Sequence, residues 1–266
     1  MVTCKTVFAL AGEALLYPVV QDKCALVDAL SESWNRDELA ISDDELPEAI
    51  SQPGRPPRPV LVHPSKLSRR SLHTEQGRLA LMHAIAHIEF NAINLACDAV
   101  YRFRGMPEQY YADWIRIAVE ETRHFKLLLA YLAGYGVCYG DYPAHNGLWD
   151  MAVKTADDVL LRMVLVPRVL EARGLDVTPL MIEGFRQAGD EDAVRILDTI
   201  YREEIGHVAA GSRWFQYLCK QRGLDHVEQF CQLVGNYAKG SLRGPFNLDA
   251  RKEAGFTEAE LEYIQA

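Results

Sequence analysis

Apolar residues recur three or four positions apart through most of this chain, the spacing that gathers them on one face of an α-helix. Between residues 74 and 222 this pattern predicts four long helices. Their expected bounds are Thr74 to about Arg104, Pro107 to about Ala133, Leu148 to about Arg173, and Glu191 to Arg222. A short helix from Pro179 to Gln187 is expected to join the third long helix to the fourth. Thr74 suits a helix N-cap, and Pro107 suits a first helical turn.

The segments on either side of these helices carry weaker patterns. Residues from about Thr6 to Ser33 have helical spacing that is broken near Tyr17-Pro18, which predicts one or two short helices. The proline-rich stretch 52–59 cannot be helical and predicts an extended connector. The basic pair Arg69-Arg70 is expected to lie on the solvated surface. Residues 225–266 predict two short helices flanking the loop 240–247.

We therefore predict an all-α protein, a four-helix bundle with N- and C-terminal helical extensions. Residues 1–64 would form the N-terminal extension and connector, residues 65–223 the bundle, and residues 224–266 the C-terminal extension. Pro167 lies inside the third helix and is expected to bend it. Gly206 and Gly211 either leave room for a substrate or allow a close helix contact, and the sequence does not choose between these readings.

Charged residues interrupt the apolar faces of all four predicted helices. Glu89 lies in the middle of the apolar face of the first helix, and Glu121 and His124 lie three residues apart on the second. Residues three apart in a helix share a face, so this carboxylate and imidazole can point to one place. The second half of the chain repeats the arrangement with Glu171, Glu204 and His207.

The spacing of the glutamates also repeats. Glu89 and Glu121 are 32 residues apart, and Glu171 and Glu204 are 33 residues apart. A single Glu-x-x-His is common on exposed helices, but two of them, each preceded by a glutamate on another helix, are typical of carboxylate-bridged dimetal bundles. If these pairs lay on solvated faces instead, large apolar neighbours such as Trp114 would have to face water.

The resulting ligand set is chemically suited to two divalent metal ions. Its members are Glu89, Glu121, His124, Glu171, Glu204 and His207. Two such ions would balance the charge of the carboxylates; without them, each buried carboxylate would cost several kcal/mol or take up a proton. Mixed oxygen and nitrogen ligation favours iron, with manganese or a mixed manganese–iron pair as alternatives. Glu121 and Glu204 are the candidate catalytic residues, because carboxylates can bridge metals and change their binding mode.

Four further residues near these positions are candidates for orienting the ligands. Glu120 and Glu203 each precede a ligand glutamate, and a ligating imidazole usually donates its second N–H to a carboxylate or carbonyl. We expect Glu203 to orient His124 and Glu120 to orient His207. Arg123 would offset a carboxylate in the same shell. Tyr201, one turn before Glu204, is either a core tyrosine or a redox-active phenol.

Composition narrows the function classes. The formal net charge of −9 argues against general binding to nucleic acid or anionic membranes, which requires basic patches. No uninterrupted run of about 18 uncharged apolar residues is present, so we expect no membrane span. The six cysteines show no regular spacing and are expected to be reduced thiols. We therefore expect a cytoplasmic protein.

Several motifs carry a resemblance to known families. The sequence Glu120-Glu121-Thr122-Arg123-His124 resembles the helix motif of di-iron oxygenases, acyl-carrier desaturases and the radical subunit of ribonucleotide reductase. The order of ligands is similar to that of the ferritin-like di-iron carboxylate superfamily. The segments 83–89, 98–103, 166–176 and 242–247 more narrowly resemble a bacterial ferritin-like family of unknown function, over residues 60 to 260. The arrangement is also loosely similar to that of the tRNA-modifying di-iron hydroxylase. These resemblances imply the fold and the metal site, but no reaction.

Two classes of function follow. The first is a dimetal, most simply di-iron, oxidoreductase that activates dioxygen or peroxide, with hydroxylation or desaturation of an unidentified small or macromolecular substrate as the leading chemistry. Since no flavin, nicotinamide or iron–sulfur motif is present, such an enzyme implies an external electron donor. The alternative is metal storage or handling, or peroxide detoxification. An enzyme is expected to be a monomer or small homo-oligomer and a storage protein a large shell. The roles of His83 and His87 stay open between structural support and contact with a substrate.

Overall fold

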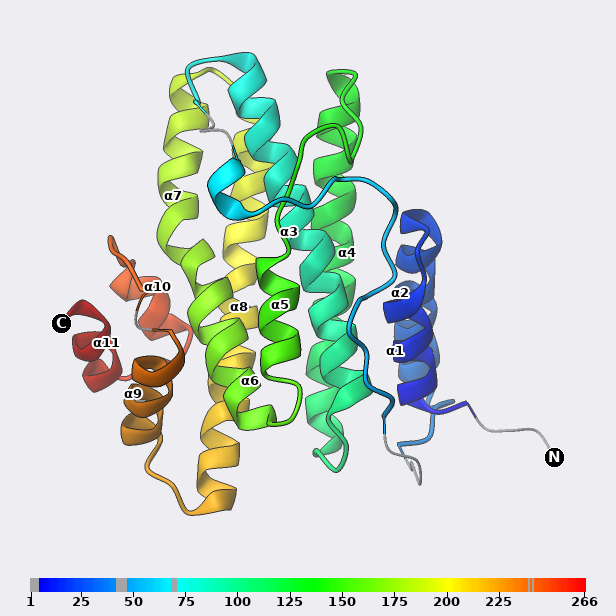
Figure 1. The fold of residues 1–266 in the computed structure, drawn as a ribbon, viewed down its shortest axis with the longest axis vertical. Coiled ribbons are helices and arrows are strands. Elements are labelled where there is room, and N and C mark those ends of the chain that lie inside the picture. The colour runs from blue at the N-terminus through cyan, green and yellow to red at the C-terminus, as the bar shows by residue number, and fades with distance from the viewer. Residues whose placement is uncertain (1–4, 42–46, 68–70, 239, 241) are drawn as a thin grey trace. The chain divides into compact units, whose positions relative to one another are not determined.

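The computed structural model describes residues 5–41, 47–67, 71–238, 240 and 242–266 (Figure 1). The Arg69-Arg70 pair lies outside the described residues. The described chain is all-α, with two isolated β-bridges and no named strand, which confirms the predicted fold class. Its long helices pack in pairs, as a bundle requires. By internal contacts the chain divides into two compact units, residues 1–153 and 154–266, and the predicted boundaries at 64 and 223 stay predictions.

The first unit is organised around one helical hairpin. Its helices are α1 (Val7–Leu16), α2 (Val20–Asn35), the short 3₁₀ turn Pro64–Lys66, α3 (Glu75–Arg102), α4 (Glu108–Gly134) and most of α5 (Gly147–Lys154). The α3–α4 pair forms the hairpin, α1 packs on α3, and α2 packs on α4. The predicted N-cap is confirmed, since the Thr74 hydroxyl accepts a hydrogen bond from the Gly77 N–H. The predicted break at Tyr17-Pro18 separates α1 from α2.

A buried lysine fixes α1 and α2 to α3. The Lys23 side chain is fully buried, and its Nζ donates to the carbonyl oxygens of Ala14 and Leu15 and to Asn94 Oδ1, each at 2.7 Å. The two carbonyls end α1, where a helix leaves its last acceptors unpaired and a cation is favoured. Lys23 thus satisfies one helix end and contacts α3 with the same group.

The second unit contains the other long pair. Its helices are α6 (Val159–Leu165), the π-helical turn Val166–Glu171, α7 (Ala172–Gln187), α8 (Glu191–Arg222), α9 (His226–Tyr237), α10 (Leu248–Glu253) and α11 (Glu258–Gln265). The α6–π–α7 stretch packs along α8. The predicted bounds of the fourth long helix agree with α8. Among the described residues after α8, three short helices occur rather than the predicted two, because Asn247 and Thr257 each start a separate helix through a side-chain cap.

The predicted continuous helix from Leu148 to Arg173 is wrong. The chain leaves helical geometry after α5, and Asp158 starts α6 by accepting a hydrogen bond from the Leu160 N–H. A buried Arg162 then donates from Nε to Thr155 Oγ1 at 2.6 Å, which fixes the break. An N-cap aspartate inside an apolar pattern was the signal for this interruption.

The helix also continues further than predicted. Pro179 was expected to begin a separate short helix, but it lies inside α7. Proline lacks the N–H that would bond to the carbonyl four residues earlier. Asn247 Nδ2 donates to that Leu175 carbonyl at 3.2 Å, so a residue from the C-terminal segment replaces the missing bond.

The expected bend at Pro167 takes the form of a π-helical turn. The Ala172 N–H donates to the Pro167 carbonyl five residues back, rather than four. Gly211 on α8 lies against this turn: a Cβ atom at Gly211 would sit 2.4 Å from Cβ and Cγ of Pro167. A Cβ at Gly206 would meet nothing within 4 Å. Gly211 therefore serves a close helix contact, one of the two readings left open.

Within the described parts of the chain, one helix, α3, is long and apolar enough to cross a membrane by length and composition, yet 78% of its apolar window is buried inside the structure. A core helix passes the same test, so this is weak evidence for a membrane span.

Candidate metal centre

Three of the predicted ligands converge inside the first unit. Glu89 comes from α3, and Glu121 and His124 come from α4. Their exposed fractions are 3%, 1% and 0%, and one ligand atom from each lies within 4.8 Å of the others. His124 Nδ1 is 3.1 Å from Glu89 Oε2 and 3.4 Å from Glu121 Oε2. The predicted convergence of these three side chains is therefore confirmed.

The electrostatics of this group suit a cation. Burial and the nearby charge of Glu121 raise the pKa of Glu89 well above its usual range. Burial alone would lower the pKa of His124, but its hydrogen bonds to Glu121 and Glu89 and their charges outweigh this and raise the pKa to about 11. These shifts favour a protonated His124 imidazole beside a Glu89 carboxyl group whose ionised form is disfavoured. A metal ion would supply the positive charge instead and leave the imidazole neutral, as a metal ligand must be.

Aromatic rings surround the side chains next to these ligands. Phe90 and Phe125, the neighbours of Glu89 and His124 in the chain, have ring centroids 5.6 Å apart. The Tyr139 ring lies 5.6 Å from Phe90 and 5.1 Å from Phe125. Phe90 and Phe125 are buried, so the chain next to these ligands lies in an apolar interior, where a charge interaction is stronger than in water.

The second unit places the other predicted ligands on its own helix pair. Glu171 closes the π-helical turn, and Glu204 and His207 lie on α8. His207 is fully buried, and its Nδ1 lies 3.5 Å from Glu204 Oε1. Glu204 Oε2 is buried without a hydrogen-bond partner among the described residues. A buried carboxylate oxygen left in this state is unfavourable unless a cation or proton reaches it. The joint assignment of all six ligands to one site stays a prediction.

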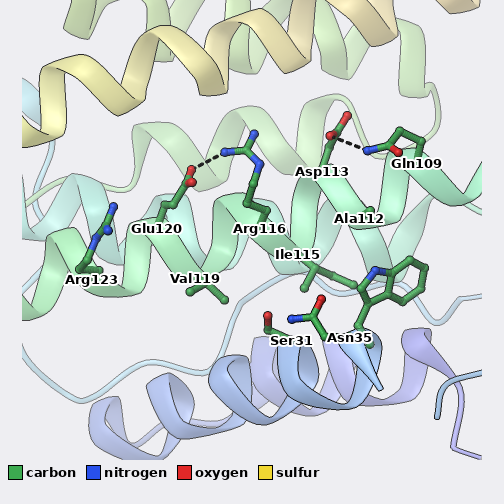
Figure 2. A pocket seen from close by; sticks show the side chains of 11 residues that line it. Ser31, Asn35, Gln109, Ala112, Asp113, Ile115, Arg116, Val119, Glu120 and Arg123 are labelled. Atoms are coloured by element: carbon green, nitrogen blue, oxygen red, sulfur yellow. Dashed lines mark hydrogen bonds and ion pairs between the residues drawn. The ribbon is translucent and has the colours of Figure 1, made fainter. Parts of the chain in front are cut away.

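The residues predicted to orient the ligands occupy varied positions. Glu120 accepts a hydrogen bond from Arg116 Nη1 at 2.6 Å, and with Arg123 it lines a pocket of about 490 Å³ between α2 and α4 (Figure 2). Tyr201 accepts a hydrogen bond from Asn247 Nδ2 at 2.9 Å. Glu203, which lies in α8, is partly buried. The predicted pairings of Glu120 with His207 and of Glu203 with His124 join the two units and stay predictions.

His83 and His87 hold the loop that follows α4. His83 Nε2 accepts a hydrogen bond from the Gly140 N–H at 2.8 Å, and its ring stacks on Tyr139. His87 Nδ1 lies 2.8 Å from the Tyr139 hydroxyl, and Nε2 lies 3.2 Å from the His145 carbonyl oxygen. Burial lowers the pKa of His87 to about 4, so the ring is neutral at pH 7. These contacts favour a structural role for both histidines. Each histidine contacts Tyr139, which the sequence did not reveal.

The described cysteines are free thiols. Cys24, Cys97 and Cys219 are buried, Cys138 is exposed, and Cys231 is partly buried. Burial raises the pKa of Cys97 to about 12, as expected of a thiol that packs as a small apolar group.

Comparison with known proteins places the chain in a family without assigning a reaction. A protein of Haemophilus influenzae described only as uncharacterized is 46% identical over 254 residues, which cover 92% of this chain and 88% of the relative. No solved structure matches. The family described as "Protein of unknown function (DUF455)" matches residues 17–262. The chain therefore belongs to the DUF455 family.

Proposed function

We propose that this protein is a dimetal oxidoreductase whose site is shared by its two helix pairs. The first pair would supply Glu89, Glu121 and His124, and the second pair would supply Glu171, Glu204 and His207. The metals would be two iron ions, with manganese or a mixed pair as the alternatives. The leading reaction is hydroxylation or desaturation of an organic substrate at the expense of dioxygen or peroxide.

One observation carries this proposal: two carboxylates and an imidazole converge in the apolar interior of the first unit. Glu89, Glu121 and His124 are at most 3% exposed, and their ligand atoms approach within 4.8 Å. Buried carboxylates at this separation repel one another unless a cation lies among them. A structural role alone would be served better by apolar side chains of the same size.

The residues of the second unit support a two-metal rather than a one-metal site. Three protein ligands from one helix pair leave a divalent ion incompletely coordinated, since iron and manganese take up to six ligands. The second pair carries the same three residue types in the same order along the chain. Its His207 is fully buried, and Glu204 has a buried oxygen without a hydrogen-bond partner among the described residues, an atom that a cation would satisfy.

The chain's own residues have separable roles in this proposal. Bound iron or manganese would supply the capacity to exchange electrons with an oxidant. Glu121 and Glu204 would adapt their carboxylate binding mode and so act as catalytic residues. Phe90, Phe125 and Tyr139 would provide the apolar surroundings of the first pair. Electrons for hydroxylation or desaturation would come from a separate donor protein, because the chain carries no flavin, nicotinamide or iron–sulfur motif.

The test is oxidation of ferrous protein. Purified apoprotein is loaded anaerobically with ferrous iron, and the ultraviolet–visible spectrum and oxygen uptake are followed after air or peroxide is added. We expect rapid oxidation with new near-ultraviolet absorption in the wild type and its loss in Glu121→Ala. Glu183→Ala, which changes an exposed glutamate on α7, is the matched control and should behave as the wild type. Identical traces for Glu121→Ala and the wild type would reject the proposal.

Size in solution separates the two classes of function. The enzyme predicted here runs as a monomer or small homo-oligomer on a gel-filtration column, with a fixed number of metal ions per chain. A large shell that takes up many iron ions per chain would instead establish storage, and the oxidoreductase proposal would be withdrawn.

A further inference from the structure

The π-helical turn that carries Glu171 is attached to the C-terminal helix by a buried ion pair. Arg168 lies in the turn, and Glu260 lies in α11. Arg168 Nη1 and Nη2 donate to Glu260 Oε1 and Oε2 at 3.0 and 2.8 Å, a two-pronged geometry that fixes both side chains. Both side chains are 0% exposed. The pair therefore joins segments 92 residues apart without contact with solvent.

The surroundings of this pair are aromatic. The Arg168 guanidinium carbon lies 4.9 Å from the Phe215 ring centroid, 4.6 Å from that of Phe230 and 4.3 Å from that of Phe256. These rings come from α8, from α9 and from the segment between α10 and α11. Arginine is thus enclosed by ring faces, where a cation is favoured, and by a single carboxylate. Movement of α11 would leave this charge buried and uncompensated.

Glu260 itself is held rigidly. Its Oε2 also accepts a hydrogen bond from the Thr257 N–H at 2.8 Å, and the Thr257 side chain accepts from the Glu260 N–H at 3.3 Å. This reciprocal capping box fixes the first turn of α11. Arg168 therefore meets a carboxylate whose position is set by the backbone of its own helix.

The π-helical turn is irregular where it carries Glu171, the predicted metal ligand. Its bond from the Ala172 N–H to the Pro167 carbonyl spans five residues, which makes a rare, widened helical turn. Arg168 lies three residues before Glu171, so the two side chains leave the same short turn. Gly211 holds the Pro167 end of the turn by close contact. Two external contacts thus fix a turn whose hydrogen bonding departs from that of a regular α-helix.

A second buried pair attaches the next turn in the same way. Arg251 of α10 donates from Nε and Nη2 to the two oxygens of Asp176 at 2.9 and 2.7 Å. Arg251 is 1% exposed and Asp176 is 5% exposed. The C-terminal helices therefore contact the chain on both sides of Glu171, at positions 168 and 176.

We propose that Glu260 is a positioning residue for the metal centre: through Arg168 it holds the π-helical turn that directs Glu171 toward the metal ions. The inference rests on the proposed function, because it assumes that Glu171 is a ligand. Buried ion pairs contribute little net stability compared with apolar residues of equal size. The Arg168–Glu260 pair is therefore better explained by a role in fixing the π-helical turn than by its contribution to stability.

The test uses replacement of the whole pair by apolar side chains and cobalt(II) as the probe. The Arg168→Met/Glu260→Leu double variant removes both charges and keeps the interior filled. Cobalt(II) is titrated into full-length apoprotein, and its visible absorption reports the coordination of each ion. We expect a midpoint of thermal unfolding near that of the wild type, but affinity for one of the two cobalt ions weakened about ten- to a hundredfold, with a changed spectrum.

The matched control changes a glutamate two positions away in the same helix. Glu258→Leu removes an exposed pair with Lys252 and should leave both cobalt affinities unchanged. Glu260→Gln is a second test variant that keeps the side-chain shape, and it should also weaken one site. Wild-type affinities and spectra in a folded double variant or in Glu260→Gln would overturn the positioning role and leave the metal site intact. A wild-type protein that binds no cobalt would overturn the proposed function and this inference together.

Discussion

The two helix pairs carry the same ligand types but reach them by different backbones. In the first unit α3 is an unbroken helix of 28 residues, and Glu89 lies in its regular interior. In the second unit the corresponding stretch is divided into α6, a π-helical turn and α7, and Glu171 ends the irregular part. A regular helix directs a side chain by its own hydrogen bonds, whereas an irregular turn needs neighbours to fix it.

The buried charged residues next to these two stretches also differ between the units. Each unit contains a fully buried cation next to its ligand-bearing helices, Lys23 in the first unit and Arg168 in the second. Lys23 bonds to neutral oxygens and meets α3 at Asn94, more than one turn beyond Glu89. Arg168 bonds to a carboxylate and lies inside the turn that carries Glu171. Lys23 therefore supports the stability of the first unit, whereas Arg168, under the positioning role proposed above, supports the geometry of the second.

The largest effect is expected from Lys23→Met. This change leaves three buried oxygens without their charged donor, and hydrogen bonds to charged groups contribute about 1.5–3 kcal/mol each. We expect the free energy of unfolding to fall by at least about 4.5 kcal/mol in a urea titration, with metal content unchanged after refolding at low temperature. Lys126→Met, which removes a half-exposed pair with Asp28, should lower it by less than about 1 kcal/mol. If the folded Lys23→Met variant bound less metal than the wild type, Lys23 would also support the metal site, and the proposed difference between the two cations would be wrong.

A smaller effect is expected from alanine at the two glycines of α8. Gly211→Ala would place Cβ against the stiff Pro167 ring, and such overpacking lowers the free energy of unfolding by about 2 kcal/mol. Gly206→Ala meets open space and should raise it by up to about 1 kcal/mol, because alanine favours the helix. Thermal unfolding of both variants measures this difference. Equal shifts would mean that the π-helical turn is not held by its contact with α8.

The smallest effect concerns Cys97 in α3. Because burial raises the pKa of its thiol from 9.0 to about 12, the unfolded chain loses this proton at lower pH than the folded protein does. Stability from this group is complete below pH 9 and falls as pH rises toward 12, by about 1.4 kcal/mol per unit. Between pH 9 and 10, wild type should lose about 1 kcal/mol relative to Cys97→Ala. Parallel urea-stability profiles for the two proteins would show that the interior of α3 is open to water.

The regular part of the fold was predictable from the sequence. Helical spacing together with Thr74 as N-cap located α3, and the glutamate–histidine spacing located the ligands on α4. These predictions succeeded because a regular helix fixes side-chain direction by sequence separation alone. Convergence of Glu89 with Glu121 and His124 then follows once two such helices pack as a hairpin.

The irregular part was not predictable in the same way. Pro179 stays inside α7 because Asn247, 68 residues away, bonds to the carbonyl that proline cannot satisfy. The interruption at Asp158 depends on a local cap that competes with an apolar pattern. The role of Pro179 therefore depends on a distant partner, which spacing does not reveal. The partner of Arg168 in α11 is a further example.

The most direct test of the shared dimetal centre is anomalous X-ray diffraction from crystals of manganese-loaded protein. The account predicts two manganese peaks per chain, with Glu89, Glu121 and His124 and also Glu171, Glu204 and His207 among the coordinating residues. A single peak held by the first three residues alone, or manganese bound only at surface carboxylates, would contradict it.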